Sequence, residues 1–329
     1  MTLASMTNGA SSATTQAPRP LKPGISVPLL TFFDENEELD LESQIKHALR
    51  LARAGLTSLT LLGSNGEACH LLPAERKTVT SAVRKALDEN SFQSLPLIVG
   101  CTAQSARETI QFCRDAHDAG GDYAIILPPS YYRPAMTDRV LIDYFRAVAD
   151  ASPIGIVLYN YPGAVAGLDM SSDVISTLAQ HANIVGCKLT CGNTGKLARI
   201  ASSVHAATPA SQGSGWMCMG GSADFTLQTL IAGGSGIITG LGNIVPKTCV
   251  RLFELYAQGK VEEAKRLQAV VARGDWAVIG GGVVGTKAGL ESWYGYGGIA
   301  RRPLPRASLE EIKKWREMLA EIVEYENSL

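Results

Sequence analysis

From residue 25 onward, short apolar runs alternate with longer stretches in which apolar residues recur every three or four positions. The short runs are continuously apolar and rich in β-branched residues, which is typical of strands buried on both faces of a sheet. The longer stretches often end in glycine and have the spacing of helices that pack through one face. The pattern therefore predicts strands and helices in strict alternation.

Eight such strand–helix units follow one another, each about 30 residues long, as expected for repeated βα units. The predicted strands are 25–32, 56–63, 95–101, 122–128, 154–160, 183–189, 215–221 and 235–241. The predicted helices are 40–55, 73–88, 105–120, 139–152, 169–182, 195–204, 223–234 and 245–259. Eight units favour a closed α/β barrel, the (β/α)8 or TIM barrel, although a doubly wound sheet has the same alternation.

The barrel pattern occupies residues 25–259 and divides the chain into three parts. Residues 260–329 carry no further strand pattern and predict a C-terminal helical segment. Residues 1–24 begin with a Ser-, Thr- and Ala-rich stretch that lacks the apolar core of a secretory signal, so we expect a disordered extension. Arg19 is the only basic residue of the first twenty, so we favour a cytoplasmic over a mitochondrial location.

Composition excludes several classes of partner. The 329 residues are 46% hydrophobic, with 30 basic and 31 acidic side chains, and no basic stripe favours nucleic acid or an anionic membrane. No apolar run is long enough to span a bilayer. The seven cysteines are scattered, which is typical of reduced thiols inside a cell. The five histidines are isolated from one another, so we expect no metal site.

The sixth predicted strand runs directly into a lysine, in "IVGCKLTCGN" (184–193). The lysine, Lys188, could simply keep its ammonium in water, or it could be a nucleophile in a dry pocket. In a (β/α)8 barrel the strand ends and the loops after them form one rim, where catalytic groups gather. The other rim segments include "GSNGE" (63–67), "PPSYYRP" (128–134) and "YNYPG" (159–163), which add hydroxyl groups and tyrosines.

These groups suit imine chemistry without a cofactor. A neutral lysine amine condenses with a ketone, and the resulting iminium accepts electrons when a neighbouring carbon–carbon bond breaks. Burial favours the neutral amine. Tyr159, at the end of the adjacent strand, is placed to relay protons. Backbone N–H groups and hydroxyls in "GSNG" could receive the carboxylate of a 2-oxo acid.

The segments "GSNGE", "YNYPG", "GCKLTCGN" and "GGSGIITGLGNIVP" together resemble the dihydrodipicolinate synthase/N-acetylneuraminate lyase family of class I, pyruvate-dependent aldolases. The resemblance covers nearly all of the chain from residue 25. It implies a (β/α)8 barrel with C-terminal helices, generally a homotetramer, that forms a Schiff base between a lysine and pyruvate or another 2-oxo acid. No other cofactor is implied.

The resemblance also assigns residues. Lys188 matches the Schiff-base lysine and Tyr159 the proton relay, while Ser64 and Asn65 match the loop pair that holds the substrate carboxylate. Tyr131 matches a tyrosine that reaches the neighbouring subunit's site, although the adjacent Tyr132 is an equal choice. Two further positions that line the pyruvate pocket in the family are Gly221 and Ile238.

Differences from the residue pattern of the dihydrodipicolinate synthases narrow the range of expected substrates. Ala164 stands where the synthases carry an arginine for a second carboxylate, so a charged amino-aldehyde partner is disfavoured. Thr190 completes the K-x-T arrangement of the sugar-acid lyases and would face a substrate hydroxyl, with Ser222 as a second contact. "GCKLTCGN" is also similar to fungal members that cleave 2-keto-3-deoxy-L-galactonate to pyruvate and L-glyceraldehyde. We therefore predict an aldolase for a 2-keto-3-deoxy sugar acid.

Several alternatives remain open at this level. The principal one is a 4-hydroxy-2-oxoglutarate aldolase, followed by a dihydrodipicolinate synthase or a dehydratase of 2-keto-3-deoxy acids. A barrel that merely binds 2-oxo acids as a sensor is the non-enzymatic alternative. Two charged residues have simpler interpretations: Glu67 as an anchor of its loop, and Lys287 as a much weaker second amine candidate that lacks neighbouring tyrosines.

Overall fold

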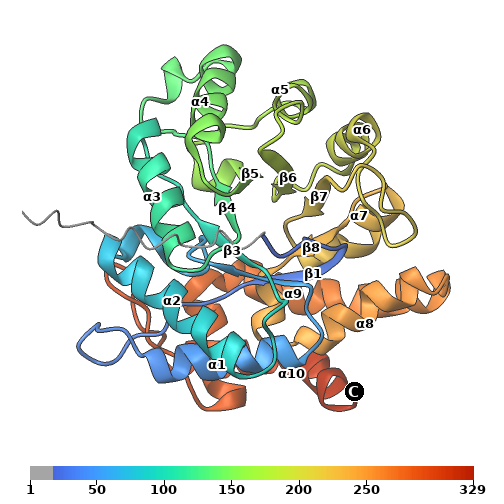
Figure 1. The fold of residues 1–329 in the computed structure, drawn as a ribbon. Coiled ribbons are helices and arrows are strands. Elements are labelled where there is room, and N and C mark those ends of the chain that lie inside the picture. The colour runs from blue at the N-terminus through green and yellow to red at the C-terminus, as the bar shows by residue number, and fades with distance from the viewer. Residues whose placement is uncertain (1–17) are drawn as a thin grey trace, which may run out of the picture.

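The computed structural model describes residues 18–329, and its centre is a closed barrel of parallel strands (Figure 1). Each strand pairs with the next, and β1 also pairs with β8, which closes the sheet. The strands are β1 (Gly24–Pro28), β2 (Ser58–Leu61), β3 (Leu97–Gly100), β4 (Tyr123–Ile126), β5 (Gly155–Asn160), β6 (Ile184–Leu189), β7 (Met217–Gly220) and β8 (Gly236–Ile238). The predicted (β/α)8 barrel is confirmed.

A helix follows every strand, with its apolar face on the sheet. These helices are α1 (Leu41–Arg53), α2 (Pro73–Glu89), α3 (Ala106–Asp118), α4 (Asp138–Ala151), α5 (Ser172–Leu178), α6 (Thr194–Val204), α7 (Thr226–Ile231) and α8 (Pro246–Ala257). Side chains cap the first turns of several of these helices. At the start of α3, for example, the Ser105 hydroxyl accepts a hydrogen bond from the backbone N–H of Glu108. The largest apolar cluster lies between strands and helices, and a smaller one lies inside the barrel.

Short 3₁₀ turns lie between strand ends and helices and shape the rim of the barrel at which the strands end. They are η1 (Ala68–His70), η2 (Arg133–Ala135), η3 (Pro162–Ala164), η4 (Ala223–Phe225) and η5 (Gly240–Asn243), after β2, β4, β5, β7 and β8 respectively. Two of these turns, η4 and η5, pack against the first helix of the C-terminal segment, α9 (Val261–Tyr294). The rim loops are therefore held from outside the barrel as well as by their own strands.

Two helices continue the chain beyond the barrel: α9 (Val261–Tyr294) and α10 (Leu309–Asn327). They pack on each other and on α8 (Figure 1). Gly282 interrupts α9 with φ 55° and ψ −149°, a conformation that glycine adopts far more readily than other residues. No helix among residues 18–329 has both the length and the apolar character needed to cross a membrane.

The first described residues pack on the barrel end at which the strands begin. Arg19 forms an ion pair with the buried carboxylate of Asp122 at 2.9 Å, and the hydroxyl of Tyr123 donates to the Arg19 carbonyl. Leu21 packs against the apolar cluster inside the barrel. Residues 18–24 therefore have a defined place where we expected part of a disordered extension; residues 1–17 lie outside the described part.

Candidate active site

Lys188 lies near the end of β6 and is almost completely buried, with 5% of its surface exposed. It pairs in register with Tyr159 on β5 and with Met219 on β7. Since Tyr159 and Met219 both belong to the apolar cluster inside the barrel, the lysine side chain also points inward. The side chain is therefore buried inside the barrel, which disfavours the surface-lysine interpretation.

Tyr159 is the immediate partner of this amine. Lys188 Nζ donates to the Tyr159 hydroxyl at 3.3 Å and lies 4.4 Å from the centre of the ring. Tyr161 follows the last residue of β5, and its ring stacks on that of Tyr159, with ring centres 5.9 Å apart and planes at 20° to each other. Burial and the neighbouring phenol raise the pKa of Tyr161 above its usual range. The nucleophile and the proton relay predicted from the sequence are thus in contact.

The loop of residues 63–67 follows β2 on the same rim. Tight turn bonds shape it, from Gly66 N to Gly63 O and from Glu67 N to Ser64 O, and Thr31 Oγ1 donates to the Gly66 carbonyl at 2.7 Å. Ser64 is exposed and Asn65 is half-buried. A Cβ at Gly240 would lie 2.6 Å from Asn65 Nδ2, so this loop lies directly beside the loop after β8.

Thr190 and Gly221 meet at the ends of β6 and β7. A Cβ at Gly221 would lie 1.9 Å from Thr190 Oγ1, so only glycine leaves room for this hydroxyl. Thr190 Oγ1 is buried and has no hydrogen-bond partner within the described chain. A buried hydroxyl without a partner is uncommon and costs free energy, so its position is suited to a bound polar group. Ile238 is buried in the same interior cluster as Tyr159.

Ser222 is connected to the C-terminal extension. Its hydroxyl donates to Asp275 Oδ2 on α9 at 2.6 Å, and the Asp224 N–H donates to the same oxygen at 3.0 Å. Asp275 is fully buried, and burial raises its pKa to about 6. Because the Ser222 hydroxyl already donates its hydrogen to Asp275, it can only accept a hydrogen bond from a substrate. The sequence reasoning missed Asp275; an acid within the apolar stretch "GDWAVIG" was the available signal.

Tyr131 and Tyr132 follow β4 and are both exposed, at 79% and 72%. Their rings meet edge to face at 5.1 Å. Neither belongs to the buried cluster around Lys188, and their similar exposure gives no reason to prefer one over the other. The substrate and inter-subunit roles expected of Tyr131, Ser64, Asn65, Thr190, Gly221, Ser222 and Ile238 stay predictions.

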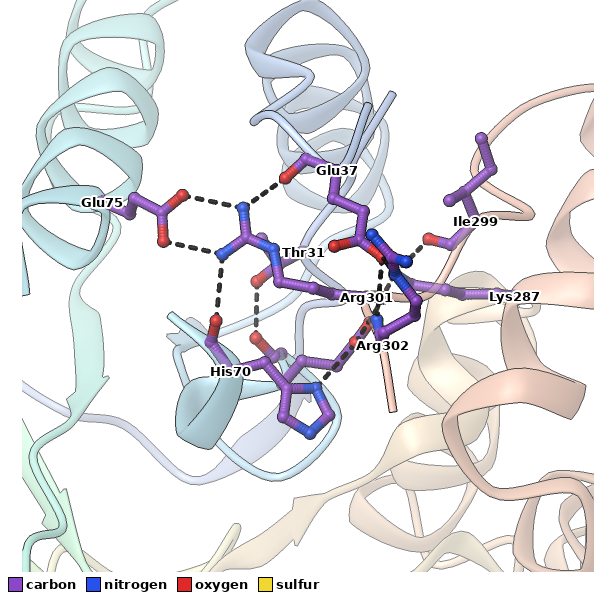
Figure 2. Close-up of polar contacts among 10 residues, drawn as sticks. Thr31, Glu37, His70, Glu75, Lys287, Ile299, Arg301 and Arg302 are labelled. Carbon is purple, nitrogen blue, oxygen red and sulfur yellow. Dashed lines mark hydrogen bonds and ion pairs between the residues drawn. The ribbon is translucent and has the colours of Figure 1, made fainter. Parts of the chain in front are cut away.

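Lys287, the second amine candidate, is fully buried in an ion pair. Its Nζ donates to Glu67 Oε1 at 2.5 Å and to the Ile299 carbonyl at 2.6 Å (Figure 2). Burial lowers the pKa of Lys287, while the Glu67 carboxylate opposes this shift. Glu67 is therefore an anchor of its loop, as predicted, and Lys287 is its counter-ion. Within residues 18–329 no cluster of three or more His, Cys, Asp or Glu side chains could hold a metal ion.

A buried amine in contact with a phenol, at the strand ends of a (β/α)8 barrel, is the kind of site that barrel enzymes carry. The profile of the dihydrodipicolinate synthetase family matches residues 22–322. The chain belongs to this family.

Individual relatives agree with this assignment. An L-threo-3-deoxy-hexylosonate aldolase of Hypocrea jecorina is 52% identical, over 95% of this chain and 100% of that protein. A protein of Emericella nidulans named "Probable 4-hydroxy-2-oxoglutarate aldolase, mitochondrial" is also 52% identical, over 95% of this chain and 99% of its own length. The solved structure of a dihydrodipicolinate synthase family protein from Coccidioides immitis has a TM-score of 0.83 at 34% identity, covering 95% of this chain and 99% of that one.

The chain is accordingly an enzyme of the aldolase type, a lyase, as predicted from the sequence. Similarity to aldolases over nearly the whole chain disfavours the alternative of a non-enzymatic barrel that only binds 2-oxo acids as a sensor. The name of the E. nidulans relative includes "mitochondrial", which bears against our expectation of a cytoplasmic location without deciding it.

Proposed function

We propose that this protein is a Schiff-base aldolase that cleaves a 2-keto-3-deoxy sugar acid to pyruvate and an aldehyde. The preferred substrate is 2-keto-3-deoxy-L-galactonate, which gives pyruvate and L-glyceraldehyde. The observation that carries the proposal is the buried amine of Lys188, 3.3 Å from the hydroxyl of Tyr159. Burial of an amine beside a proton-transfer group is the arrangement that imine formation needs.

The proposed reaction begins with attack of Lys188 Nζ on the C2 carbonyl of the substrate. Loss of water gives an iminium, which accepts the electron pair of the C3–C4 bond when that bond breaks. Tyr159 gives its phenol proton to the hydroxyl group that departs as water, and the resulting phenolate then takes the proton of the C4 hydroxyl, so C4 leaves as the aldehyde and the remaining three carbons form an enamine. Protonation of the enamine at C3 and hydrolysis by water release pyruvate and return the free amine.

The loop of residues 63–67 is proposed to hold the substrate carboxylate. Ser64 and Asn65 lie at the rim, and the backbone of this loop turns tightly through Gly66. A Cβ at Gly66 would lie 3.0 Å from the Leu29 carbonyl, so the turn depends on the glycine. Hydroxyl and N–H donors held in this way would orient the carboxylate and place C2 near Lys188.

Specificity for a hydroxylated substrate is proposed to come from Thr190. Its buried, unpartnered hydroxyl would gain a partner when a substrate hydroxyl binds. Ser222 would accept a second hydrogen bond, because its own hydrogen goes to Asp275. Ala164 lies on η3 and offers no charge for a second carboxylate. A hydroxylated aldehyde product fits these groups better than a charged one.

A second candidate is cleavage of 4-hydroxy-2-oxoglutarate to pyruvate and glyoxylate. It is favoured by the E. nidulans relative, which is as similar to this chain as the sugar-acid aldolase of H. jecorina. This substrate carries a second carboxylate, which a cation would normally bind. The position of Ala164 therefore favours the sugar acid.

The assay that tests the proposal measures pyruvate released from 2-keto-3-deoxy-L-galactonate, from its stereoisomers and from 4-hydroxy-2-oxoglutarate. We expect kcat/KM for 2-keto-3-deoxy-L-galactonate to exceed that for 4-hydroxy-2-oxoglutarate by about tenfold or more, as buried polar contacts typically allow. Thr190→Val, which keeps the shape and removes the hydroxyl, should reduce this ratio. A higher kcat/KM for 4-hydroxy-2-oxoglutarate would support the second candidate. Consumption of the sugar acid without pyruvate would indicate a dehydratase, and condensation of pyruvate with an amino-aldehyde would indicate a synthase.

We also propose a homotetramer, in which Tyr131 or Tyr132 reaches the neighbouring subunit's site. The support is that both rings are largely exposed in the single chain, although aromatic side chains of this size are usually buried at a core or an interface. Light scattering coupled to size exclusion tests the assembly. Comparison of Tyr131→Phe with Tyr132→Phe tests which hydroxyl acts, since only one of the two should reduce kcat.

A further inference from the structure

The C-terminal helix α9 contacts two rim loops through two buried charges of opposite sign. Lys287 reaches the loop after β2, and Asp275 reaches the loop after β7. We propose that α9 orients the substrate-binding loops, with Lys287 positioning the carboxylate-binding loop and Asp275 positioning the hydroxyl-binding loop. This inference rests on the proposed function, and it adds two positioning residues that do not themselves touch the substrate.

The Lys287 contact is built as a closed polar network around Glu67. The exposed side-chain fractions of Lys287 and Glu67 are 0% and 1%. Glu67 Oε2 also accepts from the Arg301 N–H at 2.9 Å and pairs with His70 Nδ1 at 3.1 Å. Figure 2 shows Lys287, Ile299 and Arg301 converging from the C-terminal segment on this cluster.

Glu67 transmits this anchoring to the carboxylate-binding residues. It directly follows residues 63–66, and its backbone has φ 51°, a left-handed conformation that is unfavourable for a residue with a side chain. The ion pair with Lys287 and the Arg301 contact together offset that cost, and Lys287 supplies the contact to Glu67 Oε1. Loss of Lys287 would therefore release the turn that presents Ser64 and Asn65.

Arg301 adds further contacts between the segment after α9 and the region that follows β2. Its guanidinium makes a bidentate ion pair with Glu75 on α2, at 2.7 Å for both bonds, and also donates to the His70 carbonyl. Bidentate arginine–carboxylate pairs are geometrically specific. The segment after α9 is thereby fixed to the start of α2, which keeps the Lys287 end of the helix at a constant distance from the loop.

The Asp275 contact lies on the other side of the kink at Gly282. Its carboxylate accepts from the Ser222 hydroxyl and the Asp224 N–H. Two helical turns earlier, Gln268 accepts from the Leu227 N–H at 2.8 Å and donates to the carbonyls of Ala223 and Asp224. The first half of α9 thus holds the whole of η4, and with it the orientation of the Ser222 hydroxyl.

The two contacts predict separable effects on the reaction. Lys287 should influence the binding of any 2-oxo acid, including pyruvate, because every such substrate has the carboxylate. Asp275 should influence only substrates with hydroxyl groups beyond C3, because the contact proposed for Ser222 is with such hydroxyl groups, which pyruvate lacks. A merely structural role of α9 would change both kinds of substrate together.

The first test uses Lys287→Met, with Lys265→Met as the matched control on the same helix. The Lys265 side chain is 57% exposed, and within residues 18–329 its ion pair is with the exposed Glu262. The readout is the pyruvate concentration that half-saturates borohydride trapping at Lys188. We expect it to rise by about tenfold or more in Lys287→Met, the loss typical of a displaced charged contact, while trapping at saturation is retained. A half-saturating pyruvate concentration equal to that of the wild type and of Lys265→Met would overturn the proposed positioning role of Lys287.

Lys287→Met leaves an uncompensated carboxylate in the interior and could prevent folding. The double variant Glu67→Gln with Lys287→Met removes both charges and keeps the side-chain volumes, so folding is retained more readily. We expect this variant to show the same increase in the half-saturating pyruvate concentration. A folded double variant with wild-type trapping would contradict the proposal.

The second test uses Asp275→Ala, with Asp275→Asn as the conservative variant and Glu262→Gln as the surface control. We expect Asp275→Ala to lower kcat/KM for the sugar acid by about tenfold, while the half-saturating pyruvate concentration changes by less than about twofold. The asparagine carbonyl can still accept from Ser222, so Asp275→Asn should recover most of the loss. Equal losses for the sugar acid and pyruvate, or no loss, would overturn the Asp275 part.

If Asp275→Ala does not fold, Ser222→Ala provides the same information. It removes the positioned hydroxyl and leaves the Asp224 bond to Asp275 intact. It should lower kcat/KM for the sugar acid without changing pyruvate trapping, and an unchanged kcat/KM would contradict the proposal. Absence of trapping in the wild-type protein would instead refute the proposed function, so the two failures are distinguishable.

Discussion

The amine of Lys188 and the hydroxyl of Tyr159 lie 3.3 Å apart, on residues that pair in register across β6 and β5. Because adjacent parallel strands fix this register, the distance is set by the barrel and does not depend on a mobile loop. The two groups are also nearly buried, at 5% exposure each. The proposed nucleophile and the proposed proton-transfer group are thus held in contact before any substrate binds.

Replacement of Tyr159 by phenylalanine should separate binding from proton transfer. The variant keeps the ring that packs beside Lys188 and loses only the hydroxyl. We expect kcat for aldol cleavage to fall by about 10²–10⁴-fold, the range for loss of a general acid–base group, with a much smaller change in pyruvate binding. Steady-state kinetics and borohydride trapping measure the two effects. Tyr325→Phe on α10 is the control, and equal losses of kcat and pyruvate binding would argue against a relay.

A side chain at position 221 should remove the space that Thr190 occupies. In Gly221→Ala the new Cβ would lie 1.9 Å from Thr190 Oγ1 and 2.6 Å from Thr190 Cα, so the backbone itself must shift. We expect a loss of stability of about 1–3 kcal/mol from overpacking, together with a large fall in kcat/KM. Denaturant unfolding and the pyruvate-release assay measure the two quantities. Wild-type values for both would show that the rim is more adaptable than this contact implies.

Lys287→Met should destabilise the protein strongly. Removal of the cation leaves the Glu67 carboxylate buried without a counter-ion, which typically costs about 3–5 kcal/mol. The exposed pair of Lys265 with Glu262 predicts a change of less than about 1 kcal/mol for Lys265→Met. Urea unfolding of the two variants at neutral pH tests the difference. Similar unfolding midpoints would mean that the Glu67–Lys287 pair contributes little to stability.

The buried carboxyl group of Asp275 should make stability depend on pH in an unusual direction. Its pKa in the folded protein is about 6, above the 3.8 of an unperturbed aspartate, so folding favours the protonated form. The stabilising contribution is therefore complete below pH 4 and is lost as the pH rises through 6. The pKa difference corresponds to about 3 kcal/mol.

The comparison with Asp275→Asn isolates this contribution, because asparagine does not titrate. As the pH rises from about 4 to about 7, the unfolding free energy of the wild type should fall relative to that of the variant. Denaturant unfolding at a series of pH values provides the measurement. Parallel pH profiles for the two proteins would show that Asp275 is ionised throughout this range.

The architecture and the proximity of Lys188 and Tyr159 could be predicted from the sequence because their signals are local. Buried strands and amphipathic helices leave characteristic periods, and the position of Lys188 at a strand end follows from the chain itself. Boundaries were less accurate. Predicted strand 235–241 is β8, Gly236–Ile238, because the next residues already turn into η5. Predicted helix 223–234 divides into η4 and α7, where Gln268 binds the carbonyls that a continuous helix would use.

The supporting polar contacts could not be predicted, because their partners are remote in the chain. Glu67 and Lys287 are 220 residues apart, and Ser222 and Asp275 are 53 residues apart. No periodicity indicates which buried charge meets which loop. The same holds for Arg19, whose contact with Asp122 orders residues that by composition alone favour disorder.

The most direct test of the central claim is borohydride reduction in the presence of pyruvate, followed by peptide mapping of the added mass. Reduction of the imine between pyruvate and a primary amine should leave a stable adduct on the peptide that contains Lys188, and Lys188→Ala should abolish it. An adduct on another lysine, or no adduct in active protein, would contradict the account.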